Sequence, residues 1–93
     1  MNGIIDVQSF GLDSIYLKLD DASRYEACVK VLSQSLKSID MTNNFEIKRE
    51  YVNKLLDRSI KYYLKIEEYE SVRLLSDIQE VLNSTNYIES YKG

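Results

Sequence analysis

The chain has 93 residues, of which 44% are hydrophobic and 29% are charged. These proportions are typical of one globular domain and exclude an intrinsically disordered chain. The formal net charge is −3, whereas a domain that binds nucleic-acid phosphates is usually basic overall, so we expect no nucleic-acid partner. No apolar run approaches the roughly 20 residues of a membrane-spanning helix, so we also expect no membrane insertion.

The use of cysteine indicates a reducing compartment. Cys28 is the only cysteine, so no internal disulfide can form, and we expect a cytoplasmic protein. The first residues, Met1 to Asp6, lack the basic n-region and the long apolar h-region of a secretory signal peptide. Cys28 lies within an apolar stripe, which favours a buried hydrophobic side chain over a reactive thiol.

Residue types on which catalysis often depends are missing from the chain. It has no histidine, no glycine-rich phosphate loop, and no set of cysteine and histidine residues for zinc. The adjacent acids Asp20/Asp21 and Glu67/Glu68 are more often helix caps than catalytic pairs. We therefore predict that the protein is not an enzyme and uses no metal or cofactor.

The first part of the chain predicts two helices. The apolar residues of the segment 5–19 follow the i, i+3, i+4, i+7 spacing of one helical face at Leu12, Ile15, Tyr16 and Leu19. Gly11 weakens the first half of this helix. A second helix is predicted over 22–39, and either Asp20 or Asp21 can cap its start.

The second part of the chain predicts two further helices and a short tail. Asn43 and Glu46 resemble a capping box before a helix over 45–66, the strongest of the four. The next helix covers 69–82, and the tail, 87–93, is long enough for one more turn only if it packs on something.

No segment shows the alternation of a β-strand, so the predicted fold class is all-α. We expect four to five helices stacked as tetratricopeptide-like helical hairpins, with no sheet. They form a single domain over 1–93, in which 1–4 and 84–93 are expected to be frayed.

One short stretch of sequence occurs twice. Residues 16–21, Tyr-Leu-Lys-Leu-Asp-Asp, recur as 63–68, Tyr-Leu-Lys-Ile-Glu-Glu. Tyr-Glu and a small residue follow the second copy directly and the first copy after three further residues, 22–24. We interpret each copy as a helix end, an acidic turn, and a helix whose first tyrosine packs back on the previous helix. Chance similarity in a chain rich in lysine, glutamate and leucine is the alternative. The spacing is wider than the roughly 34 residues of a tetratricopeptide repeat.

A family resemblance lies in the same part of the chain. Leu55-Leu56-Asp57-Arg58-Ser59-Ile60 through Glu68-Tyr69-Glu70-Ser71, together with Tyr25-Glu26-Ala27-Cys28, resemble the tetratricopeptide-like co-chaperones of type III secretion needle subunits. The resemblance covers about 23–82. It implies a protein that binds a needle subunit together with a second small helical chaperone and keeps the subunit from polymerising in the cytoplasm.

The tyrosine content also indicates a partner. The chain has eight tyrosines, and protein interfaces are enriched in tyrosine. We predict that Tyr16, Tyr51, Leu55 and Tyr62 contact a partner helix in an apolar groove. For Leu55 the favoured alternative is a position in the core. The expected assembly is a heterodimer or heterotrimer with small helical proteins.

The distribution of charged residues along the chain supports a second interpretation of the function. Lys54, Arg58, Lys61 and Lys65 form a basic stripe at i, i+4, i+7 and i+11, which we interpret as a solvated face or a dock for acidic segments of this chain or of a partner. The two ends of the chain are acidic. This favours an alternative function, a small acidic inhibitor of a toxin or nuclease, such as an immunity protein, an antitoxin or a phage-encoded blocker.

Overall fold

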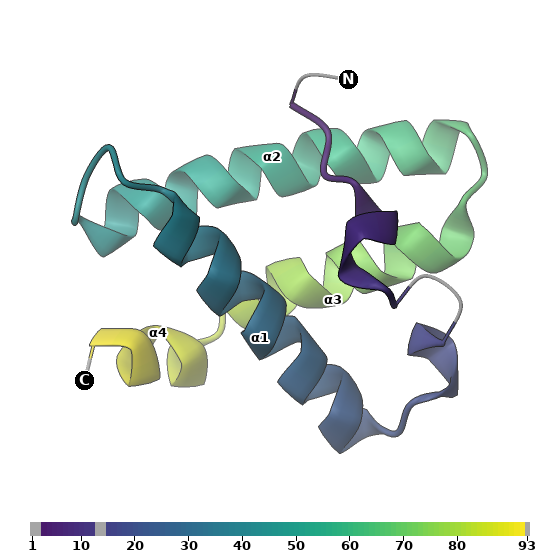
Figure 1. Cartoon of the computed structure of the whole chain (residues 1–93), viewed down its shortest axis with the longest axis horizontal. Coiled ribbons are helices and arrows are strands. Elements are labelled where there is room, and N and C mark those ends of the chain that lie inside the picture. Colours follow the sequence, from purple (N-terminus) through teal and green to yellow (C-terminus); the bar gives the residue numbers. More distant parts are fainter. Residues whose placement is uncertain (1–2, 13–14, 93) are drawn as a thin grey trace.

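The computed structural model describes residues 3–12 and 15–92 (Figure 1). These residues contain helices and no strand, so the all-α prediction is confirmed for the described part of the chain. In chain order the elements are the 3-10 helices η1 (Val7–Phe10) and η2 (Tyr16–Lys18), followed by the α-helices α1 (Asp21–Ser38), α2 (Phe45–Lys65), α3 (Tyr69–Leu82) and α4 (Thr85–Lys92).

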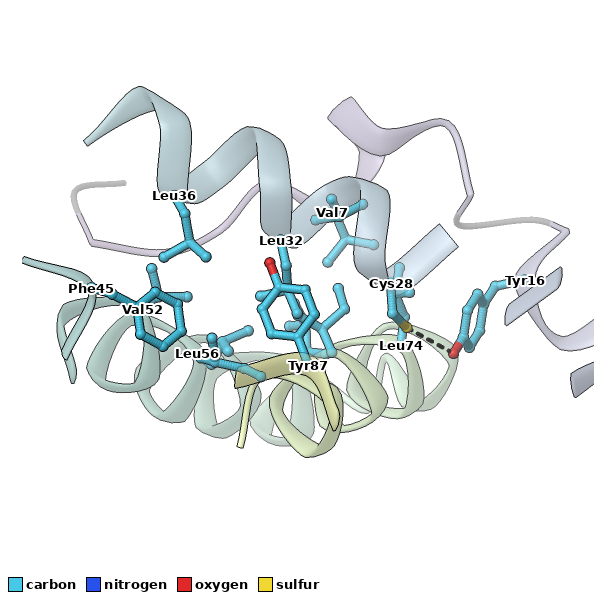
Figure 2. Close-up of a cluster of buried hydrophobic side chains, with 14 residues drawn as sticks. Val7, Tyr16, Cys28, Leu32, Leu36, Phe45, Val52, Leu56, Leu74 and Tyr87 are labelled. Carbon is cyan, nitrogen blue, oxygen red and sulfur yellow. Dashed lines mark hydrogen bonds between the residues drawn. The ribbon is translucent and has the colours of Figure 1, made fainter. Parts of the chain in front are cut away.

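The helices form two layers. α2 and α3 run antiparallel as a hairpin, α1 crosses this hairpin, and the first residues of the chain cross α2 beside α1 (Figure 1). The buried apolar side chains lie between α1 and the hairpin (Figure 2). They are Val7, Tyr16, Cys28, Val31, Leu32, Leu36, Phe45, Val52, Leu56, Leu74, Leu75, Ile78, Leu82 and Tyr87. The burial of Cys28 agrees with its position in the apolar stripe, and burial raises the pKa of its thiol.

The α2–α3 hairpin is joined by polar side chains as well as by the core. Asn53 and Asn83 exchange two amide hydrogen bonds, each of 2.9 Å, and Arg49 donates to the Asn83 amide oxygen at 2.8 Å. One turn further along, the Gln79 amide donates to the Asp57 carboxylate at 2.8 Å. These contacts fix the register of the two helices without adding apolar area.

The turn between α2 and α3 is built on a left-handed residue. Glu67 has φ 62, a conformation that glycine adopts more readily at the end of a helix. The Glu67 amide donates to the Leu64 carbonyl at 3.1 Å and the Glu68 amide to the Tyr63 carbonyl at 2.9 Å. This pattern is a Schellman motif, so Glu67 belongs to the end of α2 and Glu68 to the start of α3.

Two helix starts use the side-chain caps that short polar residues provide. Asp20 caps α1 by accepting from the Ser23 amide at 2.8 Å, and this hydrogen bond lowers the pKa of the Asp20 carboxyl. For α2 the predicted cap is wrong by one residue, because Asn44 rather than Asn43 accepts from the Ile47 amide, at 3.2 Å. Glu46 therefore falls inside the first turn of α2.

The predicted helix over 5–19 is wrong. Its described residues form η1 and η2, and Gly11 ends η1 in the left-handed region at φ 69. Residues 13 and 14 of that segment lie outside the described residues. The Ile5 and Val7 amides donate to side chains of α2 instead of joining a helix of their own.

The two copies of the repeated stretch do not have the same structure. The first copy contains η2 and the start of α1, whereas the second contains the end of α2 and the turn after it. The tyrosines that follow the copies, Tyr25 and Tyr69, are 47% and 61% exposed. The expectation that each packs back on the preceding helix is therefore wrong.

The last helix, α4, is held by aromatic packing. Tyr87 is buried against the core, and the Tyr91 ring stacks on the Phe45 ring at a centroid distance of 4.4 Å. Figure 2 shows Tyr87 and Phe45 among the core side chains below α1. A helix of this length is not stable alone, and these contacts supply the packing that it requires.

Candidate interaction surface

α2 also exposes apolar side chains to solvent. Val52 and Leu56 face the core, whereas Ile47 is 51% exposed and Tyr51 44% exposed. Met41, in the connection before α2, is 65% exposed. We call Met41, Ile47 and Tyr51 the apolar strip. Single exposed apolar residues are common on protein surfaces, but a group of this kind marks a candidate contact site.

The apolar strip adjoins a hollow between the end of α1 and α2. This Tyr51 hollow has a volume of about 410 Å³. It is lined by Ile5, Ser35, Ser38, Ile39, Asp40, Met41, Tyr51, Val52 and Leu55. Two of the residues predicted to bind a partner, Tyr51 and Leu55, are thus together on its wall. Leu55 is half-buried, which is compatible both with a position in the core and with contact to a partner.

The N-terminal segment, residues 3–7, closes one end of the hollow. Its backbone is held by two side chains of α2. The Ser59 hydroxyl accepts from the Ile5 amide at 2.8 Å, and the Tyr63 hydroxyl donates to the Ile5 carbonyl at 2.7 Å. Val7 completes the attachment, since its amide donates to the Tyr63 hydroxyl at 3.3 Å and its side chain is buried.

Tyr62 lies beyond the N-terminal segment, in a second hollow of about 400 Å³. Ile5 lines both hollows, so it separates Tyr62 from Tyr51 and Leu55. The Tyr62 ring also packs edge-on against the Tyr63 ring at 5.1 Å. The structure therefore places the three predicted residues of α2 along one helix but divides them between two hollows.

Tyr16 lies in the core, with no exposed surface, and not in the apolar groove predicted with Tyr51, Leu55 and Tyr62. Its hydroxyl donates to the Asp77 carboxylate at 2.6 Å and is 3.5 Å from the Cys28 sulfur (Figure 2). Burial, followed by the Asp77 hydrogen bond, raises the pKa of Tyr16 above its ordinary value of 10.0. The prediction failed because η2 turns this side chain inward, away from the surface of α2.

The basic stripe lies on solvent-exposed positions of α2. Lys54, Arg58, Lys61 and Lys65 are all exposed. Arg58 also lies against the N-terminal segment, since a Cβ added to Gly3 would collide with its guanidinium. The stripe is thus a surface feature, as the sequence predicts for a solvated face.

Sequence reasoning missed three parts of this surface. Ser59 is a single polar residue between Leu56 and Ile60 on an apolar side of α2, and that interruption is the signal that could have identified it as a backbone-binding position. The exposure of Met41 depends on where α1 ends. Ile47 belongs to the apolar pattern of α2, but it lies nine residues from the buried Leu56 and so on the opposite side of the helix.

Residues 3–12 and 15–92 contain neither a metal-binding cluster nor a membrane-spanning helix. Within these ranges no group of three or more cysteine, aspartate or glutamate side chains is placed to hold a metal ion. None of the helices in these ranges is both long and apolar enough to cross a membrane.

Comparison of the chain with protein-family models, with curated proteins and with solved structures gives no match. The class that the fold defines is thus an all-α domain of two packed layers. The resemblance to needle-subunit co-chaperones stays a prediction. The case for a function rests on the apolar strip, the Tyr51 hollow and the charges beside them.

Proposed function

We propose that the protein is a chaperone or adaptor that binds a small helical protein along α2 and keeps it from self-assembling. The observation that carries this proposal is the apolar strip of Met41, Ile47 and Tyr51 beside a hollow of about 410 Å³. A helix laid into an apolar groove is a common mode of recognition between helical proteins. A type III secretion needle subunit is the partner that the sequence resemblance implies.

The apolar strip by itself supports only weak binding. Covering three half-exposed apolar side chains contributes on the order of 3 kcal/mol before the costs of association. A partner side chain that fills the Tyr51 hollow adds apolar contact at the centre of the interface, where binding energy tends to concentrate. We therefore expect a partner helix with at least one large apolar residue directed into the hollow.

The test uses two matched variants of α2. Ile47, near the start of α2, is 51% exposed, and Leu64, near the end of the helix and away from the Tyr51 hollow, is 52% exposed. Ile47→Lys should weaken the binding of a labelled, uncharged amphipathic helical peptide at least about tenfold, which is about 1.4 kcal/mol. Leu64→Lys should leave the affinity unchanged. Fluorescence anisotropy measures both dissociation constants.

Two results would contradict the proposal. One is an equal loss for both variants, which would indicate nonspecific apolar adhesion. The other is that the wild-type chain binds the amphipathic peptide no more tightly than it binds a scrambled peptide of the same composition. Circular dichroism of each variant checks that the helices are intact.

The alternative of an acidic inhibitor has less support from charge placement. Asp21, Asp77 and Glu80 line a third hollow of about 380 Å³, but Arg24 and Arg73 line it as well. Arg73 donates to the Asp77 carboxylate at 3.2 Å. The charge at this hollow is therefore largely balanced, whereas an inhibitor of a basic enzyme would need an unbalanced acidic face.

A further inference from the structure

The basic stripe lies alongside the residues of the proposed partner site. Tyr51 and Lys54 are three residues apart on α2, and Leu55 and Arg58 are also three apart, so each pair lies on neighbouring positions of the helix surface. From Lys54 to Lys65 the stripe extends about 16 Å along the helix axis. A partner helix that covers the apolar strip would therefore have one edge beside these cations.

The chain itself does little to neutralise the stripe. The only ion pair of the stripe within the described ranges joins Lys54 and Glu50 at 3.8 Å, and both side chains are 72% exposed. Such a surface pair contributes little. Glu67, Glu68 and Glu70 form an acidic segment of this chain that could dock on the stripe, but they form no ion pair with it within those ranges.

Acidic residues elsewhere on α2 are directed away from the stripe. Asp57 accepts from Gln79 of α3, and Glu46 pairs with Arg49 at 2.8 Å. The exposed side of α2 consequently stays positive on a chain whose net charge is −3. Charge complementarity at an interface mainly sets specificity and the rate of association.

We propose that the partner helix has an acidic edge beside its apolar face. This inference rests on the function proposed above, and it specifies the charge pattern of the partner helix. The matching pattern is Asp or Glu at i, i+4, i+7 and i+11, because two helices that pack at a shallow angle of about 20° stay in step over this length.

The opposite rim of the hollow makes the fit directional. Asp40 lies on that rim, on the side of the α1–α2 connection. An acidic edge beside Asp40 would be repelled, whereas the same edge beside Lys54 and Lys61 would be attracted. The partner helix should therefore have acids on one edge only, and this fixes which way round it lies in the groove.

A single-stranded RNA is the other polyanion that a basic stripe can bind. The observations favour a protein, because the stripe adjoins Ile47 and Tyr51 and because the rest of the chain is acidic. An RNA strand would extend beyond the length of α2 and meet those acids.

The test compares three peptides on the unchanged protein. All three share one leucine-rich helical face, and their edge residues are glutamate, lysine or an uncharged amide. At low salt the glutamate-edged peptide should bind about fivefold tighter than the uncharged one, and the lysine-edged peptide should bind more weakly. This preference should shrink in 0.5 M salt, where the screening length falls to about 4 Å.

Matched charge reversals complete the design. Lys54→Glu/Lys61→Glu should abolish or invert the preference for the glutamate edge. Lys18→Glu/Lys30→Glu changes the net charge equally at two exposed lysines outside α2 and should preserve it.

The outcomes separate the two proposals. Equal affinity for all three peptides would overturn the acidic-edge inference and leave the proposed function standing. No binding by any of them would overturn the proposed function. Binding of a single-stranded RNA oligonucleotide more tightly than the glutamate-edged peptide, with the same loss in Lys54→Glu/Lys61→Glu, would overturn the inference in favour of a phosphate-binding surface.

Discussion

The N-terminal region and the α2–α3 hairpin are held in place by different kinds of contact. The hairpin consists of two amphipathic helices that follow each other in the chain and are joined by a three-residue turn, and its polar contacts join residues 22 to 34 positions apart. The N-terminal region has only η1 and η2, and it is fixed by Ser59, Tyr63 and Asp77, which lie 54 to 61 residues away along the chain. Local signals therefore determine the hairpin, and distant partners determine the N-terminal region.

The largest effect that tests this contrast is expected at Tyr16. Tyr16→Ala removes a fully buried aromatic side chain, which should cost about 3–5 kcal/mol in the free energy of unfolding. The loss should appear in urea unfolding followed by far-UV circular dichroism, although the N-terminal region contributes little helix of its own.

The control for Tyr16 is Tyr25→Ala, because Tyr25 is 47% exposed. Its effect should be about 0.5 kcal/mol or less. If Tyr16→Ala left the unfolding midpoint unchanged, the N-terminal region would be independent of the helical core.

A smaller effect is expected from the hydroxyl that holds the N-terminal segment. Tyr63→Phe removes the hydrogen bonds to the Ile5 carbonyl and from the Val7 amide. It should weaken the attachment by about 1–2 kcal/mol. Hydrogen exchange should show a loss of protection at the Val7 amide, with the amides in the middle of α2 and α3 unaffected.

Tyr62→Phe is the matched control for this variant. Within the described residues, the hydrogen bonds to Ile5 and from Val7 are made by the Tyr63 hydroxyl and not by the Tyr62 hydroxyl. The Val7 amide should therefore keep its protection in Tyr62→Phe. Equal exchange in both variants would mean that the burial of Val7 and the Ile5–Ser59 hydrogen bond hold the segment without the Tyr63 hydroxyl.

The smallest expected effect is a gain within the hairpin. Glu67→Gly places glycine at a residue whose φ is 62, and relief of the left-handed conformation should stabilise the protein by about 0.5–1 kcal/mol. Thermal unfolding should show a midpoint several degrees higher. Glu70→Gly, inside the first turn of α3, should change it in the opposite direction, because glycine weakens a helix interior.

The helices from α1 to α3 were predictable because the free energy that forms them is encoded locally. Apolar residues recur at helical spacing in each, and Asp20 supplies a cap at the expected place. The segment 5–19 also has helical spacing, yet Gly11 and the hydrogen bonds to Ser59 and Tyr63 outweigh it. No pattern within 5–19 itself contains that information.

The candidate surface was predictable only in part, for a similar reason. Periodicity identifies the apolar residues of α2, including Tyr51 and Leu55, but it does not identify which of them α1 leaves uncovered. Tyr16 has the same periodicity and is buried by α1 and α3. Exposure depends on how the helices are placed, which is a property of the whole chain.

The long separation between the N-terminal segment and its partners has a consequence during synthesis. A ribosome makes residues 3–16 before Ser59, Tyr63 and Asp77, which follow their partners by 54 to 61 residues. At roughly 5–20 residues per second, this delay is about 3–12 seconds. Throughout that time Val7 and Tyr16 have no core to enter. Residues 3–16 can therefore reach their final place only after the partner residues in α2 and α3 have been made.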